Sequence, residues 1–353
     1  MRYKLLGNSG LRVSEFCLGT MSFGEDWGWG ADQAECGRIV KAFTAAGGNF
    51  IDTSHLYTNG TAEQYVGELV RPDRDRWVLS TKYTMTRDPR DPNAAGNHRK
   101  NLVHSLESSL RRLETDYIDL FWVHIWDYLT PVEEVVRALD DQVRAGKILY
   151  VGISDTPAWI VAQANTLAAL RGWSPFVALQ LQYSLVERTV EREYLALARA
   201  LDLAITAWSP LGSGVLTGKY RPGVRPSGEQ DRLANPDTAP DQVLTERNFA
   251  IVDVVRQVAE EVEATPAQVA LAWLVRRPGV VIPIIGVRSE QQLSANLGAL
   301  DVELDDGQLA RLDEVSRISL GFPHDFANDV ASFGYGRAYP DIDDHRAHRS
   351  ARA

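Results

Sequence analysis

The chain has 353 residues, of which 44% are apolar and 24% charged, an ordinary composition for a globular protein with a large core. Its formal net charge of −10 argues against a general surface for nucleic acid. The two cysteines, Cys17 and Cys36, lack the spacing of metal ligands, so we expect neither a disulfide framework nor a cysteine metal site.

The first residues, MRYKLLGNSG, lack the long apolar run of a signal peptide. No window approaches 18 consecutive apolar residues, the length that a membrane-spanning helix needs. We therefore expect a cytoplasmic protein that does not enter a membrane.

Short apolar runs alternate with amphipathic stretches along the chain. The opening YKLLGNSGLRVS predicts a β-hairpin that turns near residues 8–10. Stretches such as DQAECGRIVKAFTAAG and PVEEVVRALDDQVRAGK separate the later runs and have the periodicity of helices. The runs expected to form strands are 15–20, 49–53, 77–82, 118–124, 148–154, 177–183, 203–209 and 280–286.

Strands that alternate with helices predict parallel βαβ units, and near-continuous apolar strands fit a parallel sheet covered on both faces. Eight such units predict an α/β fold, a closed (β/α)8 TIM barrel preceded by the β-hairpin. The alternative is a doubly wound Rossmann sheet, which needs a G-x-G-x-x-G turn after its first strand. The first turn here reads LGTMSFGEDWGWGADQ, whose glycines lack that spacing, so the barrel is favoured.

One barrel domain is expected over residues 1–330, followed by a polar C-terminal tail over 331–353. Two further stretches, 84–98 and 218–243, are rich in Pro, Gly and polar residues and are predicted to be loops. Long loops of this kind are usually lids or disordered segments. The sequence leaves open whether 218–243 is an ordered lid.

The ends of three consecutive strands carry groups that can move protons. Asp52 ends the second expected strand, with Tyr57 in the loop beyond, while Lys82 ends the third and His124 the fourth. Active sites of (β/α)8 barrels lie at the C-terminal ends of the strands. A carboxylate, a phenol, an ammonium and an imidazole are therefore predicted to meet at one rim.

These four groups fit a single chemistry. A free phenol has a pKa near ~10, and a nearby ammonium lowers that value by favouring the phenolate. We interpret Lys82 as the group that tunes Tyr57, Asp52 as the partner of Lys82, and His124 as a hydrogen-bond donor to a substrate oxygen. The set suits a carbonyl whose oxygen gains a proton while its carbon gains a hydride. Each residue alone also fits a salt bridge or a packing role; their convergence favours catalysis.

The segments that carry these residues resemble the successive motifs of the aldo-keto reductase superfamily. They are FIDTSHLYTNGTAEQYVG, VLSTKY, YIDLFWVH, VGISD and SPLGSGVLTGKY, in matching order over roughly residues 1–325. The resemblance implies a barrel that binds NADP(H) without a Rossmann motif, and a catalytic tetrad of Asp52, Tyr57, Lys82 and His124. The long loop after the seventh strand and the ending LARLDEVSRISLGFPHDF are similar to bacterial members.

The same resemblance implies the cofactor contacts. The family's Ser-Asn pair, which holds the nicotinamide carboxamide, is Ser154 and Asp155 here, and a carboxylate cannot donate a hydrogen bond as Asn can. The aromatic residue usually stacked on the nicotinamide is Trp208 here, and Ala295 stands where Glu is frequent. The implied NADPH contacts are Ser154, Asp155, Gln180, Trp208, Ser209, Leu211, Gly214, Lys219, Gly286, Arg288, Ser289, Gln292 and Asn296.

The substrate side is less determined. Trp27 and Trp29 follow the first barrel strand and, with His55 and Trp126, are candidates for an apolar substrate pocket, although packing beneath a loop fits them equally. Such loops vary freely on barrels, so they do not name the substrate. We expect NADPH-dependent reduction of aldehydes or ketones, with Tyr57 as proton donor and a small-molecule carbonyl substrate. No metal, nucleic acid or membrane partner is expected, and the oligomeric state is open.

Two other functional classes stay open. Some relatives of the superfamily are regulatory β subunits of potassium channels that bind NADP(H), and an intact tetrad does not exclude that role. A metal-dependent barrel hydrolase would use Asp52 and His124 as ligands. Such a site needs several more carboxylates or histidines, whereas the other strand ends offer Lys, Ser and Trp.

Overall fold

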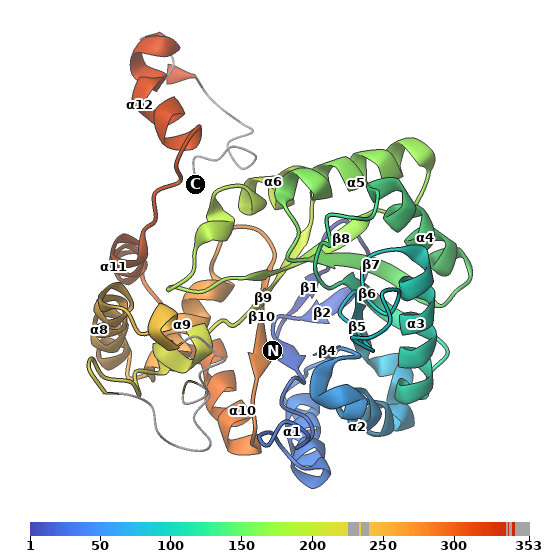
Figure 1. Cartoon of the computed structure of the whole chain (residues 1–353). Helices are drawn as coiled ribbons and strands as arrows, with labels where there is room; N and C mark the ends of the chain where they lie inside the picture. Colours follow the sequence, from blue (N-terminus) through green and yellow to red (C-terminus); the bar gives the residue numbers. More distant parts are fainter. Residues whose placement is uncertain (225–232, 234–239, 337, 339–340, 343–353) are drawn as a thin grey trace.

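Eight parallel strands close into a barrel in the structure, a computed structural model that describes residues 1–224, 233, 240–336, 338 and 341–342 (Figure 1). Strand order follows the chain, and the last strand pairs with the first. The predicted (β/α)8 fold is therefore confirmed. The strands are β3 (Cys17–Gly19), β4 (Phe50–Asp52), β5 (Val78–Tyr83), β6 (Ile118–Val123), β7 (Ile148–Ser154), β8 (Phe176–Gln182), β9 (Ala204–Trp208) and β10 (Val281–Gly286).

Helices surround the barrel and connect successive strands (Figure 1). In α4 (Val132–Arg144), Val135, Val136 and Leu139 are buried at helical spacing, which explains how one face packs on the strands. The other helices are α1 (Gln33–Ala45), α2 (Thr61–Val70), α3 (Arg99–Leu113), α5 (Ala158–Arg171), α6 (Tyr194–Leu201), α7 (Pro240–Val243), α8 (Glu246–Glu261), α9 (Pro266–Val275), α10 (Glu290–Leu297), α11 (Asp306–Ser316) and α12 (His324–Gly334). No helix in the described part of the chain is long and apolar enough to span a bilayer.

The predicted N-terminal hairpin is present and covers one end of the barrel. Strands β1 (Tyr3–Leu5) and β2 (Arg12–Ser14) pair antiparallel. Leu6, directly after β1, and Val13, within β2, are fully buried in a cluster with Phe50, Trp122 and other side chains of the barrel interior. Because the hairpin packs against the N-terminal part of the barrel interior, the C-terminal ends of the strands form the mouth.

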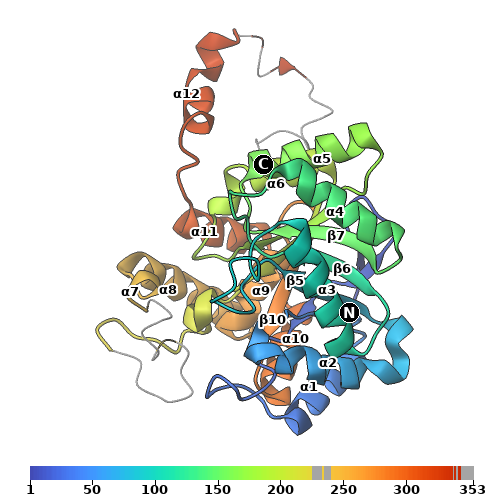
Figure 2. The ribbon, with the colours of Figure 1, turned by 45° about the vertical axis from the view of Figure 1, so that its right-hand side comes forward.

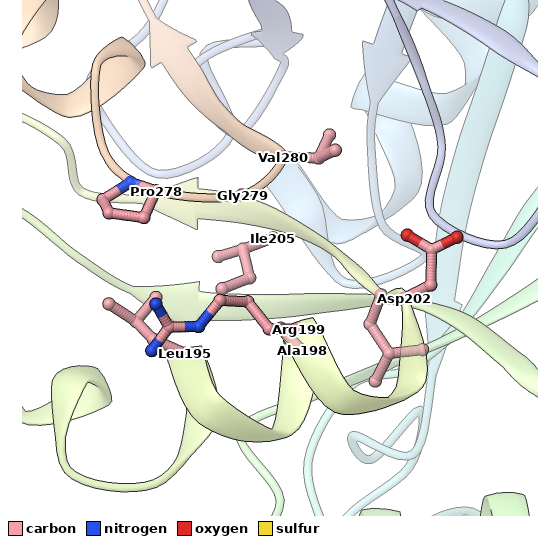
Figure 3. Close-up of a pocket in the computed structure, with 9 residues that line it drawn as sticks. Leu195, Ala198, Arg199, Asp202, Ile205, Pro278, Gly279 and Val280 are labelled. Carbon is pink, nitrogen blue, oxygen red and sulfur yellow. The ribbon is translucent and has the colours of Figure 1, made fainter. Parts of the chain in front are cut away.

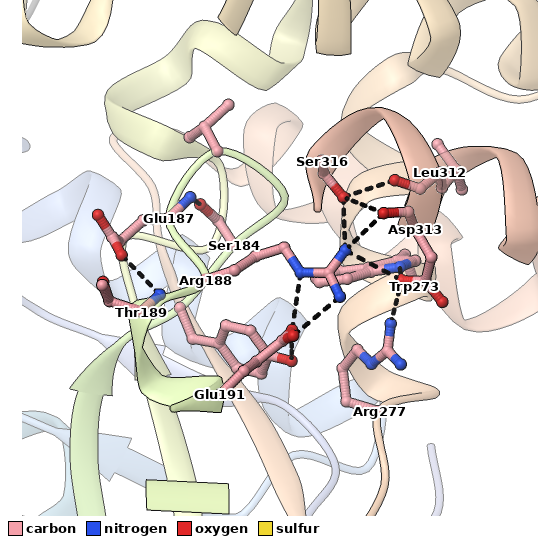
Figure 4. A network of polar contacts seen from close by, with 12 residues as sticks. Ser184, Glu187, Arg188, Thr189, Glu191, Trp273, Arg277, Leu312, Asp313 and Ser316 are labelled. Atoms are coloured by element: carbon pink, nitrogen blue, oxygen red, sulfur yellow. Dashed lines mark hydrogen bonds and ion pairs between the residues drawn. The ribbon is translucent and has the colours of Figure 1, made fainter. Parts of the chain in front are cut away.

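Arg188, in the loop after β8, connects α11 to the loop and to α9 through polar and aromatic contacts (Figure 4). Its guanidinium donates to Ser316 Oγ at 2.7 Å and to the two carboxylate oxygens of Glu191 at 2.8 and 2.9 Å. It also lies 5.2 Å from the ring centroid of Trp273. Both a carboxylate and an aromatic face therefore compensate the burial of this charge.

Beyond α11 the chain leaves the barrel wall, and α12 stands apart from it in both views (Figures 1 and 2). Near its start, His324 Nε2 lies 3.2 Å from Glu193 Oε1. Helix α12 runs across residue 330, where the sequence places the end of the barrel domain. Much of the predicted loop over 218–243 and most of the predicted tail over 331–353 fall outside the described residues.

Candidate active site

The four predicted catalytic side chains come together at the C-terminal mouth. Asp52 is the last residue of β4, Lys82 lies near the end of β5, and His124 follows β6 directly. Lys82 Nζ donates to Asp52 Oδ2 at 2.5 Å and lies 3.0 Å from Tyr57 Oη. The Tyr57 and His124 rings meet edge to face, with their centroids 6.3 Å apart.

Tyr57 is presented by a short, tightly turned segment, η1 (Tyr57–Gly60). Thr58 and Asn59 have left-handed backbones, with φ of 45° and 56°, and Gly60 follows with φ of 101°. Such a conformation costs about 1–3 kcal/mol at a non-glycine residue and persists where surrounding contacts determine it. Thr58 supplies such contacts, since its hydroxyl donates to Phe23 O at 2.6 Å and accepts from the Ala62 amide at 3.0 Å. The phenol is thus held at the mouth by a strained but well-bonded turn.

Lys82 is completely buried and has a hydrogen-bond partner for each ammonium proton. Besides Asp52 and Tyr57, its Nζ donates to Thr53 O at 2.7 Å. Burial lowers the pKa of Lys82, but the Asp52 carboxylate and the Tyr57 phenol outweigh it, so the pKa lies above its usual value. The side chain therefore stays an ammonium at neutral pH.

The second oxygen of Asp52 is also occupied. Ser80 Oγ donates to Asp52 Oδ1 at 2.7 Å, and Gln180 Nε2 donates to the same atom at 3.1 Å. Gln180, which the resemblance assigns to the nicotinamide, thus reaches across the barrel from β8 to the acid on β4. This contact is not predictable from the spacing of the two residues, because 128 residues separate them along the chain.

The pKa of Tyr57 differs from the sequence-based expectation. Lys82 does act to lower it, but burial of the phenol is the larger effect, and the net pKa lies above the usual value. Tyr57 therefore remains a protonated phenol at neutral pH. That is the form needed to give a proton to an oxygen.

His124 is neutral under the same conditions. Burial, and after it the positive charge of Lys82 and the neighbouring His55, hold the pKa of His124 well below its ordinary range. Its Nδ1 is buried without a hydrogen-bond partner among the described residues. A neutral imidazole carries one N–H, so His124 can donate a single hydrogen bond to an oxygen in the mouth.

The candidate substrate residues differ in their surroundings. Trp27 and Trp29 are half-buried, with ring centroids 5.8 Å apart, and Trp126 is buried. His55 is buried with its ring nitrogens 2.7 Å from Lys82 O and 3.1 Å from Met85 O. Both nitrogens of His55 thus face main-chain carbonyls at the end of β5.

On the other side of the mouth, Ser154 ends β7 and Trp208 ends β9. The Ser154 hydroxyl is buried and forms no hydrogen bond of good geometry within the described part of the chain. It lies near the Asp155 carboxylate, since burial raises the pKa of Asp155 while Trp208 and Ser154 oppose that rise. Asp155 has a left-handed backbone with φ of 39°, and its Oδ1 accepts from Trp208 Nε1 at 3.1 Å. The sequence singled out Asp155 as a departure from the family pattern but did not predict that it touches Trp208.

The loop after β9 turns repeatedly through left-handed conformations. Ser209, Ser213 and Gly214 have φ of 53°, 55° and 92°. Ser209 precedes η4 (Gly212–Thr217), whereas Ser213 and Gly214 lie within it, and η4 contains part of the predicted pyrophosphate loop. The remaining candidates here are Leu211, half-buried before η4, and Lys219, exposed after it.

The last group of cofactor candidates surrounds the start of α10. Ser289 caps the helix by accepting from the Gln292 amide at 3.2 Å, while Gln292 Oε1 accepts from the Arg288 amide at 2.9 Å. Gly286 ends β10, and Asn296 lies in the second turn of α10. A helix N-terminus and an arginine thus lie together beyond β10, an arrangement suited to an anion.

A separate hollow of about 390 Å³ lies at the opposite end of the barrel (Figure 3). It is lined by Arg199 and other residues of α6, by Asp202 before β9 and by Val280 before β10. Chemistry in (β/α)8 barrels is found at the C-terminal ends of the strands. The hollow is therefore not the candidate active site.

The described residues contain no group of three or more His, Cys, Asp or Glu side chains able to hold a metal.

Known proteins resemble the chain over almost its whole length. The sequence profile of the aldo/keto reductase family matches residues 15–317. Norsolorinic acid reductase of Aspergillus flavus is 36% identical over 341 residues, which is 94% of this chain and 85% of the fungal protein. Aryl-alcohol dehydrogenase [NADP(+)] of Phanerodontia chrysosporium is 36% identical over 346 residues, covering 94% of this chain and 89% of that protein. A norsolorinic acid reductase of Emericella nidulans is 38% identical over 328 residues, with 90% and 82% covered.

Proposed function

The chain belongs to the aldo/keto reductase family of oxidoreductases, and on that premise we propose that it reduces aryl aldehydes or ketones with NADPH, with Tyr57 as proton donor. The observation that carries the proposal is the placement of one buried ammonium, Lys82 Nζ, between Asp52 Oδ2 at 2.5 Å and Tyr57 Oη at 3.0 Å. Three expectations from the sequence stay predictions: the likeness to bacterial members, the cytoplasmic location and the single domain over residues 1–330.

The residues present fit a nicotinamide cofactor. The buried hydroxyl of Ser154, which forms no hydrogen bond of good geometry among the described residues, offers one to a polar group at the mouth. The left-handed loop after β9 and the start of α10 offer main-chain amides, with Arg288 beside the latter. When bound, the cofactor supplies the hydride. Ser154 would face its carboxamide, and Ser289 with Arg288 its adenosine phosphate.

The protein's own groups manage the proton. Tyr57 donates its phenolic proton to the carbonyl oxygen, and the adjacent ammonium of Lys82 stabilises the phenolate that forms. Asp52 keeps Lys82 charged and in place through the 2.5 Å contact. His124, being neutral, donates its N–H to the same carbonyl oxygen and orients it. Tyr57 is held by its contact with Lys82 before the substrate arrives, so this donor needs little reorganisation in the transition state.

The aryl preference rests on two independent supports. The similar proteins named above act, by their names, on norsolorinic acid and on aryl alcohols. In this chain the loop after β3 carries the Trp27–Trp29 ring pair, and Trp126 follows the strand that ends at the tetrad. Aromatic walls favour flat aromatic ligands through stacked and edge-to-face contacts worth about 0.5–1.5 kcal/mol per pair.

The test is an NADPH-oxidation assay with matched carbonyl pairs, such as benzaldehyde against hexanal and acetophenone against 2-octanone. We expect turnover with NADPH and a higher kcat/KM for the aryl member of each pair. Absence of turnover with every carbonyl, despite measured NADPH binding, would refute the catalytic assignment. Equal kcat/KM within the pairs would refute only the aryl preference.

A further inference from the structure

The indole of Trp208 and the carboxylate of Asp155 meet across the end of a strand. Trp208 ends β9 and Asp155 follows β7, while β8 lies between them in the barrel. Neighbouring strands lie about 4.7–4.9 Å apart, so the two side chains have to lean toward each other over β8. The hydrogen bond from Nε1 to Oδ1, 3.1 Å long, joins them there.

Strand register places the Trp208 ring on the inner side of the mouth. Gln180 points into the barrel, because its amide reaches Asp52 on β4, and it pairs with Thr206 on β9. Side chains alternate along a strand, so Trp208, two residues after Thr206, shares that inward direction. The indole therefore forms a wall of the mouth rather than part of the outer surface.

The position of the Asp155 carboxylate is set by the backbone. Its φ of 39° is left-handed, a conformation that Asp and Asn adopt more readily than other non-glycine residues. The Asp155 amide donates to Gln180 O at 3.3 Å, and the next residue, Thr156, donates its hydroxyl to Ser154 O at 2.8 Å. The acceptor for the indole is thus held in place by the turn that follows β7.

We propose that Asp155 is a positioning residue whose carboxylate fixes the Trp208 indole in the orientation that receives the flat nicotinamide ring. The inference rests on the proposed function, since it takes cofactor binding at this mouth as its premise. It gives Asp155 a task different from the direct carboxamide contact that the family resemblance implies for this position. The nearby Ser154 hydroxyl is buried and forms no hydrogen bond of good geometry among the described residues, so it can serve the carboxamide itself.

The physical basis is preorganisation. An aromatic side chain that is already held in its binding orientation loses less conformational freedom when a ligand stacks on it. A hydrogen bond of ordinary net strength changes such an equilibrium by about two- to tenfold. We therefore expect a modest effect on cofactor binding, confined to the nicotinamide end.

Three substitutions separate the roles of the acceptor, the charge and the ring. Asp155→Gly removes the acceptor and tolerates the left-handed backbone. Asp155→Asn keeps an acceptor oxygen without the charge, and Trp208→Phe keeps a ring without the donor. Trp159→Phe, at an exposed tryptophan of α5 near the same rim, is the matched control.

We expect Asp155→Gly and Trp208→Phe each to raise the Kd and KM for NADPH about two- to tenfold, and Asp155→Asn to raise them less. The double variant Asp155→Gly/Trp208→Phe should bind no more weakly than the worse single variant, because both remove one interaction. If Asp155→Gly weakens NADPH as much in the Trp208→Phe background as in the parent, Asp155 acts on the cofactor directly and the proposal is overturned. Equal damage from Asp155→Asn and Asp155→Gly would overturn it as well.

Two further measurements separate this proposal from the proposed function. Adenosine 2′,5′-bisphosphate, which lacks the nicotinamide, should bind parent and variants equally. A parent that binds neither this fragment nor NADPH would overturn both proposals together, whereas unchanged NADPH binding in all variants would overturn only the positioning role. Without any nucleotide, the indole N–H resonance of Trp208, identified by its loss in Trp208→Phe, should shift in Asp155→Gly; an unshifted resonance would contradict the hydrogen bond itself.

Discussion

At the ends of β4, β5 and β6 the charged groups are buried and paired with one another, whereas most of the candidate side chains beyond β7, β9 and β10 are more exposed. In the first region Lys82 has three acceptors and Asp52 three donors before any ligand arrives. In the second, the buried Ser154 hydroxyl forms no hydrogen bond of good geometry among the described residues. The Asp52–Lys82 pair is thus complete in itself, whereas His124 and the other half of the mouth offer groups to a ligand.

This difference predicts where substitutions act. Changes in the tetrad half should reduce turnover and stability, since they disturb groups that depend on one another. Changes in the cofactor half should reduce binding and leave the folded barrel nearly as stable, because its side chains contribute less to the core. A tetrad variant that loses only cofactor binding, or a cofactor-half variant that loses only stability, would contradict this division.

The largest effect is expected for Tyr57→Phe, which removes the proton donor and keeps the ring. General acid catalysis contributes roughly 10²–10⁴-fold, so kcat for carbonyl reduction should fall by that factor while the Kd for NADPH changes little. The matched control is Tyr117→Phe, at a tyrosine whose hydroxyl donates to Asp75 at the surface. Parent-like kcat in the Tyr57 variant would show that another group gives the proton.

Lys82→Met should be the most destabilising change at the mouth. It leaves the Asp52 carboxylate buried without its cation, and breaking a buried ion pair in this way costs about 3–5 kcal/mol. Urea unfolding measures this loss. Arg311→Met, which breaks the exposed Arg311–Glu261 pair, should leave the unfolding midpoint nearly unchanged.

The double variant Lys82→Met/Asp52→Asn sharpens the same comparison. Because it removes the uncompensated charge, it should recover part of the stability that Lys82→Met alone loses. No recovery would mean that the loss comes from packing rather than from the unpaired carboxylate.

Arg288→Ala tests the cofactor half. NADPH differs from NADH by a 2′-phosphate, and the forked guanidinium of an arginine suits phosphate oxygens. A charge-assisted contact contributes about 1.5–3 kcal/mol, so the preference for NADPH over NADH should fall roughly tenfold to a hundredfold. This preference is measured by titrating both nucleotides against the Arg288→Ala variant. The matched control is Arg276→Ala, at an exposed arginine after α9. Equal weakening of both nucleotides, or a parent that prefers NADH, would remove the assignment.

The barrel was predictable from the sequence because parallel strands, covered on both faces, appear as separate apolar runs. The meeting of Asp52, Lys82 and His124 was predictable for a related reason, since strand ends in a closed barrel converge on one rim. The position of Tyr57 was harder to predict, because it depends on the left-handed turn at Thr58 and Asn59, which residue types alone do not reveal.

Contacts that cross the barrel could not be predicted. The bond from Gln180 to Asp52 joins β8 with β4, and the bond from Trp208 to Asp155 spans the end of β8. Both join residues from strands that are not consecutive in the chain, and the spacing of residues along the chain does not encode which of them meet. The net pKa of Tyr57 was also missed, since the degree of burial, rather than the nearness of Lys82, decides its direction.

The smallest predicted effect concerns His124 and the pH dependence of stability. Burial keeps the folded-state pKa of His124 well below the value of about 6.5 expected in the unfolded chain. Below that pH the unfolded state binds a proton that the folded state does not, so the parent loses stability as the pH falls. Between pH 6.5 and pH 5 this histidine should account for about 1–2 kcal/mol of the loss. Urea unfolding at both pH values should therefore show a smaller loss for His124→Gln than for the parent. Parallel losses in the two proteins would mean that His124 titrates normally in the folded state, and the neutral hydrogen-bond donor assigned to the tetrad half would have to be another group.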